Sequence, residues 1–228
     1  MKQVMRVLLA CVAIVTSASA AAAEVYGSVT SPPGVYYGTG NPNGAFNITR
    51  GGNIELALRA KNRGAGPVLI DGSSGIYSVA QGYCNPVCGG GLKAAWNYDF
   101  SIHTTDGSAL SQYAYRLGVD HNPGAAATFD FVNPLTYWFD NAKDGLAGVQ
   151  ASQNVFFTNT PGGRFNVFTP GLYNFILLAY DTEDLAFANA LAQVEITVQV
   201  VPEPQSVALF ALGLASLAAM RRRKAKQS

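Results

Sequence analysis

Few side chains in this 228-residue chain are suited to nucleophilic or acid–base chemistry. Its histidines are His103, which follows an alternating segment, and His121, which lies in a Pro/Gly turn, and we expect both imidazoles to be solvated. A catalytic nucleophile needs a Ser or Cys beside a His and an acid. Asp99, Asp120 and Asp130 are conceivable carboxylates for glycoside hydrolysis, but nothing in the sequence brings them together. We therefore predict that the chain is not an enzyme.

Asp140 and Asp144 are weak candidates for a calcium site. They lie in a segment, 140–145, that resembles the start of a loop with oxygen ligands. The EF-hand pattern is not met, because Ala142 occupies its third position and Ala151 its twelfth, where a bidentate glutamate is needed. Acidic turns of this kind are more often solvated than metal-bound, so we expect neither a metal nor another cofactor.

Three aromatic side chains are candidates for stacking on sugar rings. Tyr36 and Tyr37 lie in a loop rich in Gly and Pro, and Trp138 lies near the end of an expected strand. Tyr and Trp present a flat apolar face with a polar group at its edge. Core packing is the alternative, and it is favoured for Trp96 by the alternation around that residue. An exopolysaccharide is therefore a conceivable partner.

Cys84 and Cys88 are close in the sequence and lie outside the apolar segment that holds the third cysteine, Cys11. In an oxidising compartment such a pair favours a disulfide that closes a very short loop. Metal binding is the alternative, but it needs more ligands than the chain offers nearby. We predict that the disulfide fixes a local turn.

The N-terminus has the pattern of a secretory signal peptide. Lys2 and Arg6 form a basic region, and the apolar run 7–15 follows, before a series of small residues that ends at Ala23. We expect a helical signal peptide over 1–23, which the Sec translocon and signal peptidase would recognise. Cleavage after Ala23 would leave a mature chain that begins at Glu24.

The C-terminus combines three unlike features in a fixed order, a motif with two prolines, an uncharged apolar run and a basic cluster. The two prolines forbid a continuous helix or a central strand. The apolar run is long enough for about 21 Å of helix at ~1.5 Å per residue, which is short for a bilayer core of roughly 30 Å. The basic residues fit a cytoplasmic stop. The features are the motif Pro202, Glu203 and Pro204, the uncharged run 207–220, and Arg221, Arg222 and Arg223.

The segment 201–228 resembles the PEP-CTERM sorting signal of Gram-negative bacteria. That resemblance implies a transmembrane helix at 207–220 and recognition by an exosortase, a membrane-embedded processing enzyme. It also implies a stay in the inner membrane during transit, followed by release to the cell surface or the exopolysaccharide matrix. A plain single-pass anchor is the alternative. The signal occurs behind unrelated domains, so it transfers no activity to the rest of the chain.

The segment 24–200 is expected to form one extracellular domain. It carries eight basic and thirteen acidic residues, a net charge of −5, which argues against a nucleic-acid partner. Short apolar runs between Gly, Pro, Asn and Asp clusters indicate a single antiparallel β-sandwich of the jelly-roll or immunoglobulin-like type. We expect strands at 25–29, 54–60, 94–102, 113–119, 128–132, 136–139, 155–158, 165–168, 172–180 and 192–201.

These observations together predict an exported protein of structural or adhesive type at the cell surface or in a biofilm matrix. A carbohydrate-binding module is the first alternative, which exposed aromatic side chains clustered on one sheet face would favour. A surface hydrolase is the second, which a deep cleft with facing carboxylates would favour.

Overall fold

The computed structural model describes residues 23–30, 44–63, 68–84, 88, 91–124, 126–137, 143–144 and 147–202. These residues form two β-sheets and a single short 3₁₀ helix, Leu110–Gln112. Sheet A contains β1 (Val25–Gly27), β2 (Phe46–Gly51), β3 (Ile54–Asn62), β4 (Val68–Leu69), β6 (Trp96–Thr104), β9 (Lys143–Asp144) and β10 (Gly148–Asn154). Sheet B contains β5 (Ile76–Ala80), β7 (Tyr113–Asp120), β8 (Phe129–Val132), β11 (Gly171–Asp181) and β12 (Ala190–Val201).

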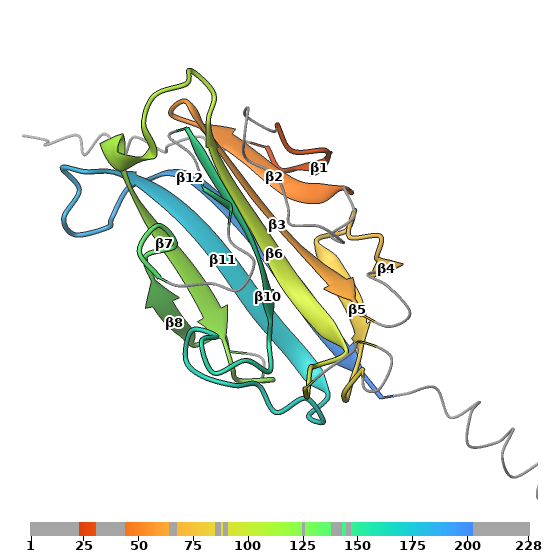
Figure 1. The fold of residues 1–228 in the computed structure, drawn as a ribbon. Coiled ribbons are helices and arrows are strands. Elements are labelled where there is room, and N and C mark those ends of the chain that lie inside the picture. The colour runs from red at the N-terminus through yellow and green to blue at the C-terminus, as the bar shows by residue number, and fades with distance from the viewer. Residues whose placement is uncertain are drawn as a thin grey trace, which may run out of the picture.

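The two sheets are layered face to face, as Figure 1 shows. Sheet A follows the order β1-β2-β3-β6-β10-β9, with β4 paired to β3, and sheet B follows β5-β12-β11-β7-β8. The predicted all-β, sandwich-like architecture is therefore confirmed. The prediction of a purely antiparallel fold is wrong, because β5 pairs with β12 in the parallel direction. Alternation in a sequence shows which residues share a face, but not the direction of the neighbouring strand.

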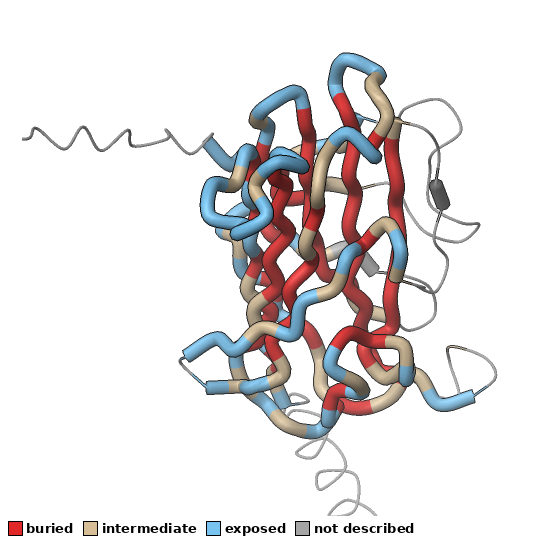
Figure 2. The backbone as a smooth tube through the Cα atoms, turned by 90° about the vertical axis from the view of Figure 1, so that its left-hand side faces the viewer, coloured by how far each residue is buried: buried red, intermediate tan, exposed pale blue. Residues whose placement is uncertain are grey.

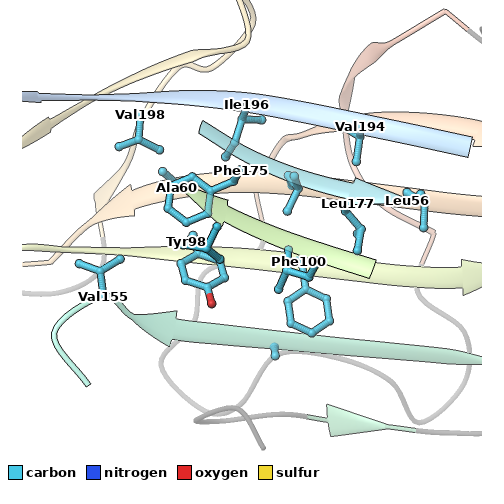
Figure 3. Close-up of a cluster of buried hydrophobic side chains, with 14 of the residues drawn as sticks. Leu56, Ala60, Tyr98, Phe100, Val155, Phe175, Leu177, Val194, Ile196 and Val198 are labelled. Carbon is cyan, nitrogen blue, oxygen red and sulfur yellow. The ribbon is translucent and has the colours of Figure 1, made fainter. Parts of the chain in front are cut away.

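Alternating apolar residues fill the space between the sheets. Leu56 and Leu58 of β3 and Phe100 of β6 have no exposed surface, and they belong to the same core cluster as Phe175 and Leu177 of β11. Figure 3 shows Leu56 and Phe100 in this cluster. Burying a side chain of this size contributes about 1.5–3 kcal/mol. Buried positions continue along the strands, whereas exposed positions gather at the loops (Figure 2).

Some expected strands are core-facing loops instead. The expected strands at 155–158 and 165–168 are wrong, because both segments form turns and irregular backbone. Val155, Phe165 and Val167 are nevertheless buried, and the Phe165 ring lies 5.6 Å from Trp96 and 6.0 Å from Phe175. Residues 136 and 137 also lie in a turn, while 138 and 139 are outside the described residues. These segments are apolar because they close one end of the core.

The outer face of sheet A is buried as well. The alternation of β3 and β6 places Glu55, Arg59, Asn97, Asp99 and Ser101 on faces that point away from the core between the sheets. Each of these residues is nevertheless buried. At one end, Val29 packs against the outer face and the Thr30 N–H donates to Glu55. A polar alternation therefore marks a second buried layer here, and not a solvated face.

The two sheets approach each other closely where β2 ends beside β12. A Cβ atom on Gly51 would clash with the backbone carbonyl of Leu191 and touch the Ala192 side chain. A backbone carbonyl cannot rotate away as a flexible side chain can. Gly51 therefore fixes the spacing between the end of β2 and the start of β12.

We predict that Gly51→Ala lowers the free energy of unfolding by about 1–3 kcal/mol, the usual cost of overpacking. Gly27→Ala is the matched control, since a Cβ there meets nothing within 4 Å. Chemical denaturation of both variants measures the difference. Equal stability of the two variants would show that β12 can move away from β2.

Candidate functional site

The last strand ends directly at the C-terminal motif. β12 lies between β11 and β5, and Val200 pairs with Gly171 while Val201 pairs with Ala80. The Gln81 N–H also donates to the Val201 carbonyl over 3.0 Å. Proline has no N–H to continue a ladder, so pairing stops before the exposed Pro202. The motif thus leaves the sandwich from a strand that is fixed on both sides.

The disulfide predicted from the sequence is present between Cys84 and Cys88, whose Cα atoms are 5.6 Å apart. The Cys88 N–H donates to the Cys84 carbonyl, and the Cys84 N–H donates to Lys93. The pair closes a local turn, as expected. Both sulfur atoms are bonded to each other, which removes them as metal ligands.

An aromatic surface lies on the outer face of sheet B. Phe131 of β8 is 37% exposed and Phe187 is 39% exposed. The Arg116 guanidinium lies between them, 4.0 Å from the Phe131 ring centroid and 5.0 Å from that of Phe187. Tyr180 and Phe129 extend the surface, with ring contacts to Phe187 at 5.1 Å and to Phe131 at 5.6 Å. We call these five residues the aromatic face.

The backbone of Phe187 is held in an unfavourable conformation. Its φ of 52° lies in the left-handed region, which is rare for a bulky residue. The surrounding loop is fixed by Asp184, whose carbonyl accepts the Phe187 N–H and whose carboxylate accepts the Asn189 N–H at 2.7 Å. The Asn189 N–H bond to the carboxylate is the first cause that lowers the pKa of the Asp184 carboxyl. Strain of this kind persists where the surrounding structure enforces it, here to hold a ring against Arg116.

A cavity of about 430 Å³ opens at the other side of sheet B. Its wall includes Glu24, Tyr26 and Asn47 from the start of the chain and β2, together with Glu195 and Thr197 of β12. Glu195 is partly shielded, and this partial burial, followed by the nearby Glu24 carboxylate, raises its pKa. Four segments that are distant in the sequence meet here, which is why sequence reasoning did not find this site.

Among the titratable residues considered from the sequence, His121 and Asp130 lie close together, because a Cβ atom on Gly162 would meet both Asp130 Oδ2 and His121 Nε2. Asp99, Asp120 and His103 are buried, so the expectation that His103 is solvated is wrong. His121 is half-buried, with its ring 4.3 Å from that of Phe165 and its Nε2 against the Pro161 carbonyl. Within the described ranges, no three His, Cys, Asp or Glu side chains form a group that would hold a metal ion.

Of the remaining predicted site residues, the structure describes Asp144, which pairs with Val149 at the edge strand β9. The residues outside the described ranges are Tyr36, Tyr37, Trp138, Asp140, Glu203, Pro204, Arg221, Arg222 and Arg223. The signal helix over 1–23 and the apolar helix over 207–220 also fall outside them. Within the described part of the chain, no helix has the length and apolar character that crossing a bilayer requires.

Comparison with known proteins decides the nature of the tail. Residues 200–224 match the PEP-CTERM protein-sorting motif. The chain carries a PEP-CTERM sorting signal. Comparison with curated proteins found no match. A similar solved structure is the CooA pilin subunit from enterotoxigenic Escherichia coli, at 15% identity over 64% of this chain and 97% of that chain. Its TM-score of 0.20 is too low to support a conclusion about fold or function.

The PEP-CTERM match confirms the family resemblance seen in the sequence. The matched span includes the Pro-Glu-Pro residues from Pro202 and the basic residues from Arg221. It also includes Val200 and Val201, the last two residues of β12. The PEP-CTERM signal implies an exported protein that passes through a membrane and is processed by an exosortase. The signal therefore begins inside the sandwich, within its last strand.

The fold that presents the PEP-CTERM tail contains a buried ionic cluster on the outer face of sheet A. The Asp99 carboxylate of β6 accepts from Arg59 Nε at 2.7 Å and from Lys61 Nζ at 2.9 Å, both on β3. All three side chains are at most 1% exposed. Burial lowers the pKa of Lys61, while the Asp99 carboxylate opposes that shift. The cluster joins the two central strands of sheet A.

We predict that Asp99→Asn lowers the free energy of unfolding by about 3–5 kcal/mol, because it leaves two buried cations without their shared carboxylate. The apolar triple variant Arg59→Met/Lys61→Met/Asp99→Leu should recover most of that loss. Asp106→Asn is the control, since Asp106 lies in an exposed turn. Denaturant titration separates the three, and a loss below about 1 kcal/mol for Asp99→Asn would show that the cluster is dispensable.

Proposed function

We propose that the chain is an exported, non-enzymatic protein of structural or adhesive type, delivered to the cell surface or exopolysaccharide matrix by an exosortase. The observation that carries this proposal is the PEP-CTERM signal at 200–224, which continues directly from a strand paired on both sides. The signal peptide at 1–23, the domain at 24–200 and the tail at 201–228 would be handled in turn by the Sec translocon, signal peptidase and the exosortase.

The features of the sandwich support a load-bearing role outside the cell. Its last strand pairs with β11 over ten residues and with β5 over five. A pull on the tail would therefore act along a strand that is hydrogen-bonded on both sides. The disulfide between Cys84 and Cys88 suits an oxidising compartment. Assignment to the jelly-roll or immunoglobulin-like class, and the absence of a metal cofactor, are part of this proposal.

Polysaccharide binding is the second candidate function. It is favoured by the aromatic face, where exposed Phe131 and Phe187 flank Arg116. Aromatic rings pack against the C–H faces of sugars, and a guanidinium binds carboxylates bidentately. This face would suit an acidic polysaccharide.

A surface hydrolase is the weakest candidate. Glu24 and Glu195 line the same cavity, which is the arrangement that a glycosidase needs in outline. Both residues are exposed to solvent, however, whereas a general acid needs a shielded carboxyl group. We therefore propose that these carboxylates bind a ligand and do not catalyse a reaction.

The delivery route is tested in a Gram-negative host with and without its exosortase. We expect surface-associated protein whose intact mass lacks residues 1–23 and the basic C-terminus, and full-tail protein in the inner membrane when the exosortase is deleted. Pro202→Ala/Glu203→Ala/Pro204→Ala should cause the same retention, whereas Gln205→Ala should not. Surface protein that still contains Arg221–Ser228 would contradict exosortase processing.

The aromatic face is tested by affinity electrophoresis in gels that contain acidic or neutral polysaccharides. If this face binds, Phe131→Ala/Phe187→Ala should weaken retention about tenfold, or ~1.4 kcal/mol. Leu185→Ala is the control, because Leu185 is 86% exposed on the same loop. Tyr36→Ala/Tyr37→Ala tests the loop named from the sequence. Unchanged retention of the double phenylalanine variant would exclude the aromatic face.

A further inference from the structure

The cavity beside β12 has the size and shape of a ligand site. Its volume of about 430 Å³ lies within the ~300–1,000 Å³ that small-molecule sites usually occupy. It is bordered by the turn 73–75, by Ile76 at the start of β5, and by Thr197, whose N–H donates to the Gly75 carbonyl at 2.9 Å. That hydrogen bond ties the turn to β12 and keeps the cavity wall in place.

Asn47 contributes a buried hydrogen-bond donor to this cavity. Its side chain is 3% exposed and lines the wall. Its Oδ1 accepts from the Tyr77 hydroxyl at 2.7 Å, which fixes the carboxamide. Its Nδ2 donates to no group in the part of the chain that the structure describes. The hydrogen bond from Tyr77 holds the amide N–H at the cavity wall, where it is a donor available to a ligand that accepts from it.

The charge of the cavity selects the ligand further. Glu24 and Glu195 line it, and none of the lining residues that the structure describes is basic. Ser73 and Thr197 add hydroxyl groups, and Ile76, which is 46% exposed, adds an apolar surface at the rim. Carboxylates favour a cation, whereas hydroxyl groups and an amide favour a polyol. An apolar patch beside them suits the C–H face of a sugar ring.

We infer that this cavity binds a sugar residue that carries a free, protonated amino group. The ammonium group pairs with the Glu195 and Glu24 carboxylates, and the ring hydroxyls accept from Asn47 and exchange hydrogen bonds with Ser73. This inference names a ligand class for the polysaccharide-binding function proposed above and rests on it. Its site is separate from the aromatic face.

Signal-peptide cleavage changes the cavity without reversing its charge. Cleavage after Ala23 would place the new α-ammonium group on Glu24 itself, at the cavity wall. The two carboxylates would still exceed this one positive charge, so a cationic ligand remains favoured. Signal-peptide cleavage would therefore lower, but not abolish, the affinity of the site for a cationic ligand.

Acidification should weaken binding. The titratable side chains that line the cavity are Glu24, Tyr26 and Glu195. Glu195 pairs with the uncharged Ile176 on β11 and has no paired residue on β5. Partial burial and the Glu24 carboxylate raise the pKa of Glu195, so this carboxylate is neutralised earlier than an ordinary glutamate as the pH falls. An ammonium group then loses its partner.

The test is calorimetric titration of the full chain in detergent with three tetrasaccharides: β-1,4-linked glucosamine, its N-acetylated form, and cellotetraose. We expect the amino form to bind about tenfold more tightly than the two neutral forms. Glu195→Gln should remove that preference, while Glu183→Gln, which changes the net charge equally in an exposed loop, should keep it. Salt should weaken binding of the amino form alone.

The other possible results contradict either the amino-sugar inference or the non-enzymatic proposal. Equal affinity for the three tetrasaccharides, or an unchanged affinity of Glu195→Gln for the amino form, would overturn the inference. Heat with calcium chloride but none with the amino form would replace it with a metal site. If the amino form does not bind while Phe131→Ala/Phe187→Ala still abolishes retention on polysaccharide gels, the inference fails and polysaccharide binding stands. Cleavage of a tetrasaccharide, seen by mass spectrometry, would overturn the non-enzymatic proposal alone.

Discussion

The fold depends on one carboxylate that is shared by two cations out of contact with water. Asp99 accepts from Arg59 and Lys61 across the β3–β6 pair, and the Arg59 guanidinium also lies 4.2 Å from the Phe46 ring centroid. Three strands of sheet A are thereby held at one register, since a one-residue slip would turn every one of these charges into the apolar core. Such a cluster adds little net stability, but each alternative pairing would leave a buried charge unpaired.

This arrangement makes the two sheets unequal. β3, β6 and β10 of sheet A are buried on both faces. Sheet B is buried on its inner face, and its outer face carries the aromatic face around Arg116. The cavity around Glu195 lies where β1 and β2 of sheet A meet β5 and β12 of sheet B. The strand that holds Glu195 also ends at Val201, directly before Pro202. Ligand contact and tail attachment therefore converge on β12, and sheet A serves as the rigid support behind it.

The sequence predicted the long strands in which apolar and polar residues alternate. β3, β6, β11 and β12 were expected within a few residues, and the Cys84–Cys88 bond followed from its spacing. β10 was missed because polar residues occupy both of its faces, as the buried Gln150 and Gln153 show. β2 and β5 were missed although they alternate, because they have only six and five residues. Periodicity cannot distinguish a polar face that meets water from one that meets a second buried layer.

The functional surfaces were harder to predict for a different reason. The pair Phe129 and Phe131 alternates around Asp130, a signal that could have marked the aromatic face, but Phe187 joins it only because its loop holds a left-handed backbone. The cavity draws on residues 24, 47, 73–76 and 195–197, which only the sheet order brings together. A short tail signal is read by an enzyme as contiguous sequence, and so it is visible without a fold. A binding site assembled across β1, β2, β5 and β12 exists only once the parallel pairing of β5 with β12 has formed.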